Sequence, residues 1–183
     1  LADAHFVAKA MTGKANQIAP CIACNQACLD HTFSGKLSSC LVHPRACSET
    51  ELVIEPAATP KSIAVVGAGP AGLSAAMTAA ERGHAVTLID RADEIGGQLN
   101  MAKQVPGKEE FWGLVDWYRT MIAEQGIEVR LNTEATPEML SGFDDVIIAT
   151  GVLPRDPAIP GQDSAYVHSY IDVLKLRSLP GKR

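Results

Sequence analysis

The sequence predicts an α/β domain with a parallel sheet, preceded by a short segment rich in cysteine. Short apolar runs at 63–66, 85–89 and 145–149 have the length and composition of buried parallel strands. A glycine-rich stretch joins the first run to an alanine-rich one, and all five cysteines lie before the first run. At 183 residues, the chain can bury one ordinary hydrophobic core and carry an appendage.

The glycine-rich stretch has the order of a phosphate-binding loop. It precedes an alanine-rich helix expected at 71–82, which ends before Gly83, a natural C-terminal cap. Gly67 allows the tight turn, Gly69 lets the backbone approach a pyrophosphate, and Gly72 lets the helix pack close to the sheet. The free N–H groups at the start of the helix would then meet the phosphates. The residues predicted to form this cofactor-binding loop are Gly67, Ala68, Gly69, Pro70, Ala71 and Gly72.

Asp90 strengthens this interpretation, because it ends the run at 85–89 and lies about 20 residues beyond the loop. A carboxylate in this place holds a ribose hydroxyl of a bound dinucleotide, and it favours a ribose without a 2′-phosphate. The alternative is a glycine turn with no ligand. The order of strand, glycine turn, helix, strand and acid instead predicts a Rossmann-like FAD/NAD(P)-binding domain.

The remaining elements follow from periodicity. Apolar residues recur at helical spacing over 109–124, which predicts an amphipathic helix whose apolar stripe belongs to the core. Residues 127–131 alternate like a half-exposed strand, and 170–176 are expected to form a short helix. Apolar positions in 1–11 also have helical spacing, although no partner for that face is evident in the sequence.

Composition argues against several classes of partner. The formal net charge is −5 and the sequence pI is about 5.5, with no run of Lys or Arg. These values argue against nucleic acid or an anionic membrane as the main partner. No apolar stretch approaches the ~20 residues of a spanning helix, and the N-terminus lacks the basic and apolar regions of a secretory signal. We therefore expect a cytoplasmic protein.

The five cysteines are Cys21, Cys24, Cys28, Cys40 and Cys47. Such clustering in an intracellular chain favours a metal site over disulfides. Four thiolates suit a tetrahedral zinc or a cubane iron–sulfur cluster, and three ligands in one loop with a distant fourth favour the cluster. Cys47 is left over and is expected to be a free buried thiol. His31 or His43 could replace one thiolate in a mixed site.

The cysteine segment resembles that of one family of flavoenzymes. The sequence Cys-Ile-Ala-Cys-Asn-Gln-Ala-Cys-Leu-Asp-His at 21–31 is followed by Ser-Cys-Leu-Val at 39–42 and Pro-Arg-Ala-Cys at 44–47. This pattern is similar to the iron–sulfur segment of bacterial NADPH-dependent 2,4-dienoyl-CoA reductase, an old yellow enzyme-type flavoprotein of fatty acid beta-oxidation. The family's Asn-Pro-Arg is His-Pro-Arg here, which leaves the cysteines untouched. The resemblance implies a 4Fe-4S cluster on Cys21, Cys24, Cys28 and Cys40, with Cys47 outside it.

The resemblance also implies a division of the chain. Residues 1–18 resemble the end of an FMN-binding barrel, 19–50 form the iron–sulfur segment, 51–61 are a linker, and 62–183 form a truncated FAD-binding domain. We expect the barrel to precede this sequence and an NADPH-binding domain to follow it in a longer chain. Both would be partners of the FAD domain, and an acyl-CoA would be the substrate of the intact enzyme.

Further cofactor contacts follow from the same resemblance. In flavoproteins of this type, the loop with paired glycines at 96–97 lies beside the flavin ring and the pyrophosphate. The tripeptide Ala-Thr-Gly at 149–151 is similar to a second flavin-contacting signature. The contacts implied are with Gly97, Gln98, Leu99, Lys108, Thr150 and Gly151. The alternative for 94–99 is a plain connecting loop.

The resemblance implies electron transfer from NADPH to FAD, on to the cluster, then to FMN and to an unsaturated acyl-CoA. The residues that protonate the substrate would lie in the barrel, so no catalytic residue is predicted in this chain, and the chain alone is not expected to reduce dienoyl-CoA. Alternatives stay open. The domain could bind ADP as a structural ligand in an amine-dehydrogenase-like protein, or serve another ene reductase, or be a zinc-binding interaction module.

Overall fold

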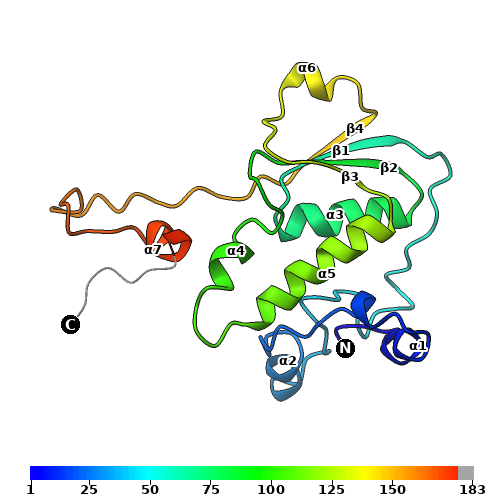
Figure 1. Cartoon of the computed structure of the whole chain (residues 1–183). Coiled ribbons are helices and arrows are strands. Elements are labelled where there is room, and N and C mark those ends of the chain that lie inside the picture. Colours follow the sequence, from blue (N-terminus) through cyan, green and yellow to red (C-terminus); the bar gives the residue numbers. More distant parts are fainter. Residues whose placement is uncertain (177–183) are drawn as a thin grey trace.

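The structure, a computed structural model, describes residues 1–176 and is centred on a four-stranded parallel sheet in the order β3-β2-β1-β4 (Figure 1). The strands are β1 (Ser62–Val66), β2 (Ala85–Ile89), β3 (Glu128–Arg130) and β4 (Asp145–Ile148). Ile63 of β1 pairs with Val86 and also with Asp145, so β1 is a central strand. The predicted Rossmann-like fold with a parallel sheet is confirmed. The expected domain reaches to residue 183, and its last seven positions, 177–183, lie outside the described residues.

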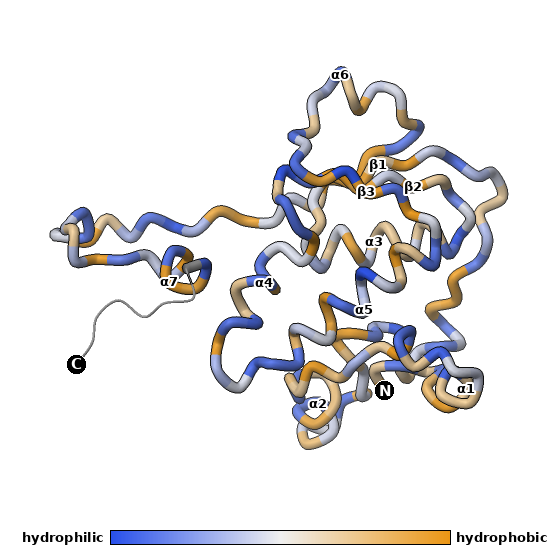
Figure 2. Tube along the Cα trace, in the orientation of Figure 1, coloured by the Kyte–Doolittle hydropathy of each residue, from blue (hydrophilic) through white to orange (hydrophobic). Residues whose placement is uncertain are grey.

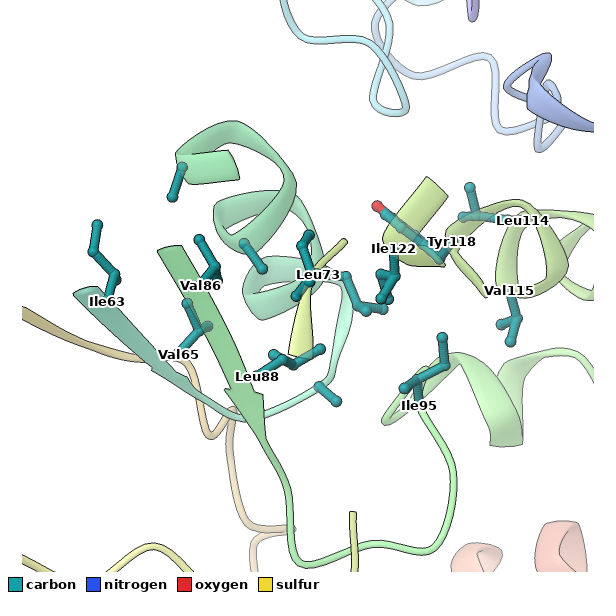
Figure 3. Packing of buried hydrophobic residues seen from close by; sticks show 14 residues of the cluster. Ile63, Val65, Leu73, Val86, Leu88, Ile95, Leu114, Val115, Tyr118 and Ile122 are labelled. Atoms are coloured by element: carbon teal, nitrogen blue, oxygen red, sulfur yellow. The ribbon is translucent and has the colours of Figure 1, made fainter. Parts of the chain in front are cut away.

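Two long helices cover one face of the sheet (Figure 1). α3 (Pro70–Glu81) connects β1 to β2, and α5 (Glu110–Glu124) precedes β3. Figure 3 shows the strand residues Val65 and Leu88 facing Leu73 of α3, with α5 alongside. The buried residues of α5 are Leu114, Val115, Tyr118 and Ile122, which belong to the apolar stripe predicted for the core. Both helices begin and end within one residue of the prediction.

The other side of the sheet is covered less completely. The short helix α6 (Pro137–Leu140) lies there, capped by Thr136, whose hydroxyl accepts a hydrogen bond from the Met139 N–H at 3.3 Å (Figure 1). β4 is an edge strand, and Ile148 at its end is 66% exposed. The apolar run of β4 predicted a buried strand, whereas most of β4 is exposed within the described residues.

The N-terminal segment consists of α1 (Phe6–Met11), a 3₁₀ turn (Ala15–Gln17) and α2 (Leu29–Phe33). It joins α5 through Trp117, whose indole Nε1 donates a hydrogen bond to the carbonyl oxygen of Gln17 at 2.9 Å. No residue of α1 is buried, and Figure 2 colours much of this helix as hydrophobic. The apolar face expected from the sequence is thus present and lies open within the described part of the chain.

The C-terminal part leaves the sheet and then returns. After β4, an extended stretch leads to α7 (Tyr170–Leu176), which contacts the short helix α4 (Leu99–Ala102) (Figure 1). The helix expected at 170–176 is present. α4, α2 and α6 were not expected, because four- and five-residue helices carry too little periodicity to be recognised. No helix within residues 1–176 has the length and apolar character needed to cross a membrane.

Replacing Leu88 by Ala tests the core. Leu88 is fully buried in β2, so the substitution is expected to lower the free energy of unfolding by about 2–5 kcal/mol. Urea denaturation followed by circular dichroism measures the change. Leu153→Ala is the control, because Leu153 is 83% exposed and should change stability by less than about 0.5 kcal/mol. Equal losses in the two variants would contradict the assigned core.

Candidate functional site

The loop between β1 and α3 adopts a shape that only glycine permits at two positions. Gly67 has φ +110°, and a Cβ there would overlap the carbonyl oxygen of Ala149. A Cβ on Gly72 would overlap the carbonyl oxygen of Gly67. The loop therefore packs against the end of β4, and α3 packs against the loop, only because both side chains are absent.

Gly69 differs because its missing side chain leaves open space. It is the N-cap of α3, with φ −77° and ψ 178°, and no atom lies within 4 Å of a Cβ built there. The second glycine loop comes alongside: the Gly96 N–H donates to the Ala68 carbonyl at 2.8 Å, and a Cβ on Gly97 would lie 2.9 Å from the Gly69 Cα. The two loops leave an open cradle at the N-terminus of a 12-residue helix, which fits a pyrophosphate.

Asp90 fixes this loop to the end of β2. Its Oδ2 accepts a hydrogen bond from the Ala68 N–H at 2.6 Å, and its Oδ1 accepts one from the Ala92 N–H at 2.8 Å. An ionised carboxylate offers about four acceptor positions, so both oxygens can still accept a hydroxyl of a ligand. Asp90 therefore holds the phosphate loop in place, and its remaining acceptor positions are compatible with the ribose contact, which stays a prediction.

Two adjoining cavities open at the carboxyl ends of the strands, where ligands bind in open α/β sheets. The larger has a volume of about 640 Å³ and lies along the glycine loops and α4, and the smaller, of about 340 Å³, lies beside 133–135. Both are lined by Gly67, Asp90, Arg91, Thr150, Gly151 and Val152. A dinucleotide has two halves joined by a pyrophosphate. A site in two parts that meet beside the phosphate loop matches that shape.

Most residues predicted to bind the cofactor line the larger cavity. These are Gly67, Gly69, Pro70, Ala71, Asp90, Gly97, Gln98, Thr150 and Gly151. Ala68 and Gly72 support the loop from behind, while Leu99 packs against the core. Lys108 lies outside both cavities, with its Nζ 5.9 Å from the centre of the Phe111 ring. All of the predicted cofactor contacts, those of Leu99 and Lys108 included, stay predictions.

Sequence reasoning missed several lining residues: Arg91, Asn100, Met101, Gln104 and the stretch 133–135. The position of 133–135 directly after β3 was the available signal, because the carboxyl ends of parallel strands meet at one edge of the sheet. The Thr133 N–H donates to the Asp90 carbonyl at 2.9 Å, which brings this stretch beside β2.

A buried lysine helps to hold the outer wall of the larger cavity. Lys103 is only 5% exposed, and its Nζ lies 3.8 Å from Glu94 Oε2 and 4.1 Å from the centre of the Trp112 ring. The Trp112 indole N–H donates back to the Lys103 carbonyl at 3.0 Å. Asn100 ties α4 to the glycine loop, because its amide Nδ2 donates to the Ile95 carbonyl at 2.8 Å. These contacts hold α4 and the loop at Glu94 together, so the outer wall of the larger cavity is held in place by interactions within the chain.

The structure does not bring the cysteines together into the metal site that the sequence predicted. All five cysteines are free thiols, and Cys47 is exposed rather than buried as expected. The Ser39 N–H donates to the Ala27 carbonyl at 2.6 Å, which joins the backbone beside Cys28 to the backbone beside Cys40. Within residues 1–176, however, no three His, Cys, Asp or Glu side chains converge in a way that could hold a metal ion. The four-thiolate cluster stays a prediction.

Comparison with known proteins agrees with the geometry of the cofactor site. Residues 61–181 match the family described as Pyridine nucleotide-disulphide oxidoreductase. The chain is 44% identical over 188 residues to "Metal reductase" from Desulforamulus reducens, and 36% identical over 190 residues to "Cinnamate reductase" from Clostridium sporogenes. Both alignments cover 100% of this chain and 28% of the relative.

Among solved structures, a complex of 2-naphthoyl-CoA reductase superposes with a TM-score of 0.93 at 36% sequence identity. The match covers 98% of this chain and 28% of that protein, so the chain spans little more than a quarter of the relatives it matches. The matched family, the parallel sheet and the open glycine cradle agree on a domain that binds FAD or NAD(P). The chain belongs to the pyridine nucleotide-disulphide oxidoreductase family.

Proposed function

We propose that this chain is the electron-transfer portion of an NADPH-dependent ene reductase of the 2,4-dienoyl-CoA reductase type, and that it binds FAD. The observation that carries the proposal is the pair of adjoining cavities that meet beside the phosphate loop. In this arrangement Asp90 and the stretch 133–135 hold the adenosine half, the cradle at Gly69 holds the pyrophosphate, and the loop at Gly97 and Gln98 faces the flavin half.

The ribose-binding acid supports FAD over NADPH at this site. Asp90 lines both cavities and would repel the 2′-phosphate of NADPH, whereas the ribose of FAD presents two hydroxyls. NADPH is therefore proposed to bind elsewhere in the longer protein, as is FMN.

The cysteine segment is proposed to hold a 4Fe-4S cluster on Cys21, Cys24, Cys28 and Cys40. Support comes from the donor set, because four free thiols in this sequence pattern suit such a cluster. FAD accepts electrons in pairs and an iron–sulfur cluster transfers them singly, which gives a chemical reason for placing the two in one chain. A reducing cytoplasmic setting belongs to the same proposal.

The substrate and partners are proposed from the relatives. "Cinnamate reductase" and "2-Naphthoyl-CoA Reductase" are names for enzymes acting on an unsaturated acid and on a CoA thioester, which supports an unsaturated acyl-CoA as substrate class. The exposed side chains of Phe6, Val7 and Met11 in α1 support an FMN-binding barrel that covers this helix in the full-length chain. Relatives that include histamine dehydrogenase, at 28% identity, support the amine-dehydrogenase-like domain as the second candidate.

Gly69→Val tests the cradle. The backbone at Gly69 suits any residue and has free space, so the variant should fold normally, while the new side chain fills the place proposed for the pyrophosphate. FAD affinity measured by isothermal titration is expected to fall at least about tenfold. Gly142→Val is the matched control, because Gly142 also has nothing within 4 Å and lies outside both cavities. Equal FAD affinities for the two variants would refute the assigned pyrophosphate site.

Metal analysis tests the cysteine assignment. The chain purified without oxygen is expected to contain about four iron and four sulfide per protein, with a broad absorption that dithionite bleaches. Cys28→Ser should lose most of this iron, while Cys47→Ser, the control outside the proposed ligand set, should keep it. A colourless protein with stoichiometric zinc, and no cluster after anaerobic reconstitution, would instead support the zinc-binding module.

A further inference from the structure

We infer that Arg91 supplies the positive charge that holds the pyrophosphate of the bound dinucleotide at the junction of the two cavities. This inference rests on the proposed function, because it concerns the same site. It adds a residue that the glycine loops and Asp90 do not account for, and it assigns that residue a role in ligand affinity.

The position of Arg91 is the first support. It follows Asp90 at the carboxyl end of β2 and lines both the larger and the smaller cavity. The other residues that line both cavities are Gly67, Asp90, Thr150, Gly151 and Val152. Arg91 is the only base in this shared set, and the junction is where the pyrophosphate joins the two halves of a dinucleotide.

The charge of the walls is the second support. The carboxylates of Asp90, Asp93 and Glu94 line the larger cavity, and Glu134 lines the smaller. A pyrophosphate adds two negative charges to this acidic surrounding, while the N-terminus of α3 contributes only about half a positive charge. A side-chain cation close to the phosphates would offset the repulsion from these carboxylates.

The described residues offer two lining cations, Arg91 and Lys175. Lys103 and Arg119 approach Glu94 at 3.8 Å and 3.5 Å from outside the cavity, so one wall carboxylate is already compensated. Lys175 belongs to α7 and lines only the larger cavity, whereas Arg91 is attached directly to the strand end that carries Asp90.

The availability of the Arg91 side chain is the third support. Arg91 is exposed, and its guanidinium has no hydrogen-bond or ion-pair partner anywhere in residues 1–176. No contact joins it to the neighbouring Asp90, whose carboxylate accepts hydrogen bonds from the Ala68 and Ala92 N–H groups. Arg119 and Arg130, by contrast, pair with acids at 2.6 Å and 2.8 Å. Arg91 is thus free to bind an anionic ligand, and its planar guanidinium suits phosphate oxygens.

Binding of nucleotide fragments to FAD-free protein tests this inference. Isothermal titration is carried out with FAD, ADP and adenosine on the 183-residue chain and on Arg91→Gln, Arg91→Lys and Arg155→Gln. Arg91→Gln is expected to weaken ADP and FAD binding about tenfold and to leave adenosine binding unchanged, because adenosine has no phosphate. Arg91→Lys keeps the charge and should lose less than about threefold.

Arg155→Gln is the matched control, because Arg155 is exposed and lies outside both cavities. The difference in ADP affinity between the unsubstituted chain and Arg91→Gln should also shrink at high salt, as a charge contact requires. Circular dichroism melts without ligand establish that each variant is folded.

Unchanged ADP affinity in Arg91→Gln would overturn the inference, as would an equal loss for adenosine and ADP, which would place the contact at the nucleoside. A loss in Arg91→Lys as large as that in Arg91→Gln would overturn the role of charge. These results are distinguishable from failure of the proposed function. If the unsubstituted chain binds ADP but not FAD, the proposed function fails while the Arg91 comparison with ADP still stands.

Discussion

The backbone of the phosphate loop is held between two strand ends, and the candidate site depends on this constraint. The Gly67 N–H donates to the Ile89 carbonyl of β2 at 2.8 Å, and Gly67 lies against Ala149 after β4. The Asp90 carboxylate also accepts a hydrogen bond from the Ala68 N–H. Because the loop is fixed from both sides, α3 begins at a defined point, and the open space at Gly69 faces the larger cavity rather than the core. A loop free to move would offer no cradle of constant shape for a pyrophosphate.

The sequence predicted the parts of the site that depend on local chemistry. A local sequence motif is formed by the glycines at 67, 69 and 72 and the acid after the second strand. Because the motif lies within a short stretch of chain, the loop, α3 and β2 could be predicted from the sequence. Residues 133–135 were missed for a different reason. Their place at the site depends on the pairing of β3 with β2, which joins positions about 40 residues apart, as in the pairing of Ile89 with Arg130.

In the N-terminal segment, the observed burial differs from the burial that the apolar pattern predicts. The helical spacing of apolar residues in α1 predicts a covered face, yet Met11 is 82% exposed. Ile22 and Val42 of the cysteine segment, in contrast, pack against the hydrophobic core, and Trp117 binds the backbone at Gln17. The cysteine segment is therefore attached to the dinucleotide domain by its own contacts, while the outer face of α1 is exposed within the described residues.

We propose that the two cavities together bind one FAD, with its adenosine beside Asp90. Isothermal titration of FAD-free protein with FAD and, separately, with FMN distinguishes this arrangement from a site for the flavin alone. FMN carries the same flavin but lacks the AMP part of FAD, which is proposed to place its adenosine in the smaller cavity and which completes the pyrophosphate. FAD is expected to bind at one molecule per chain, and FMN at least about a hundredfold more weakly. Equal affinities for FAD and FMN, or no binding of FAD by the folded chain, would contradict this proposal.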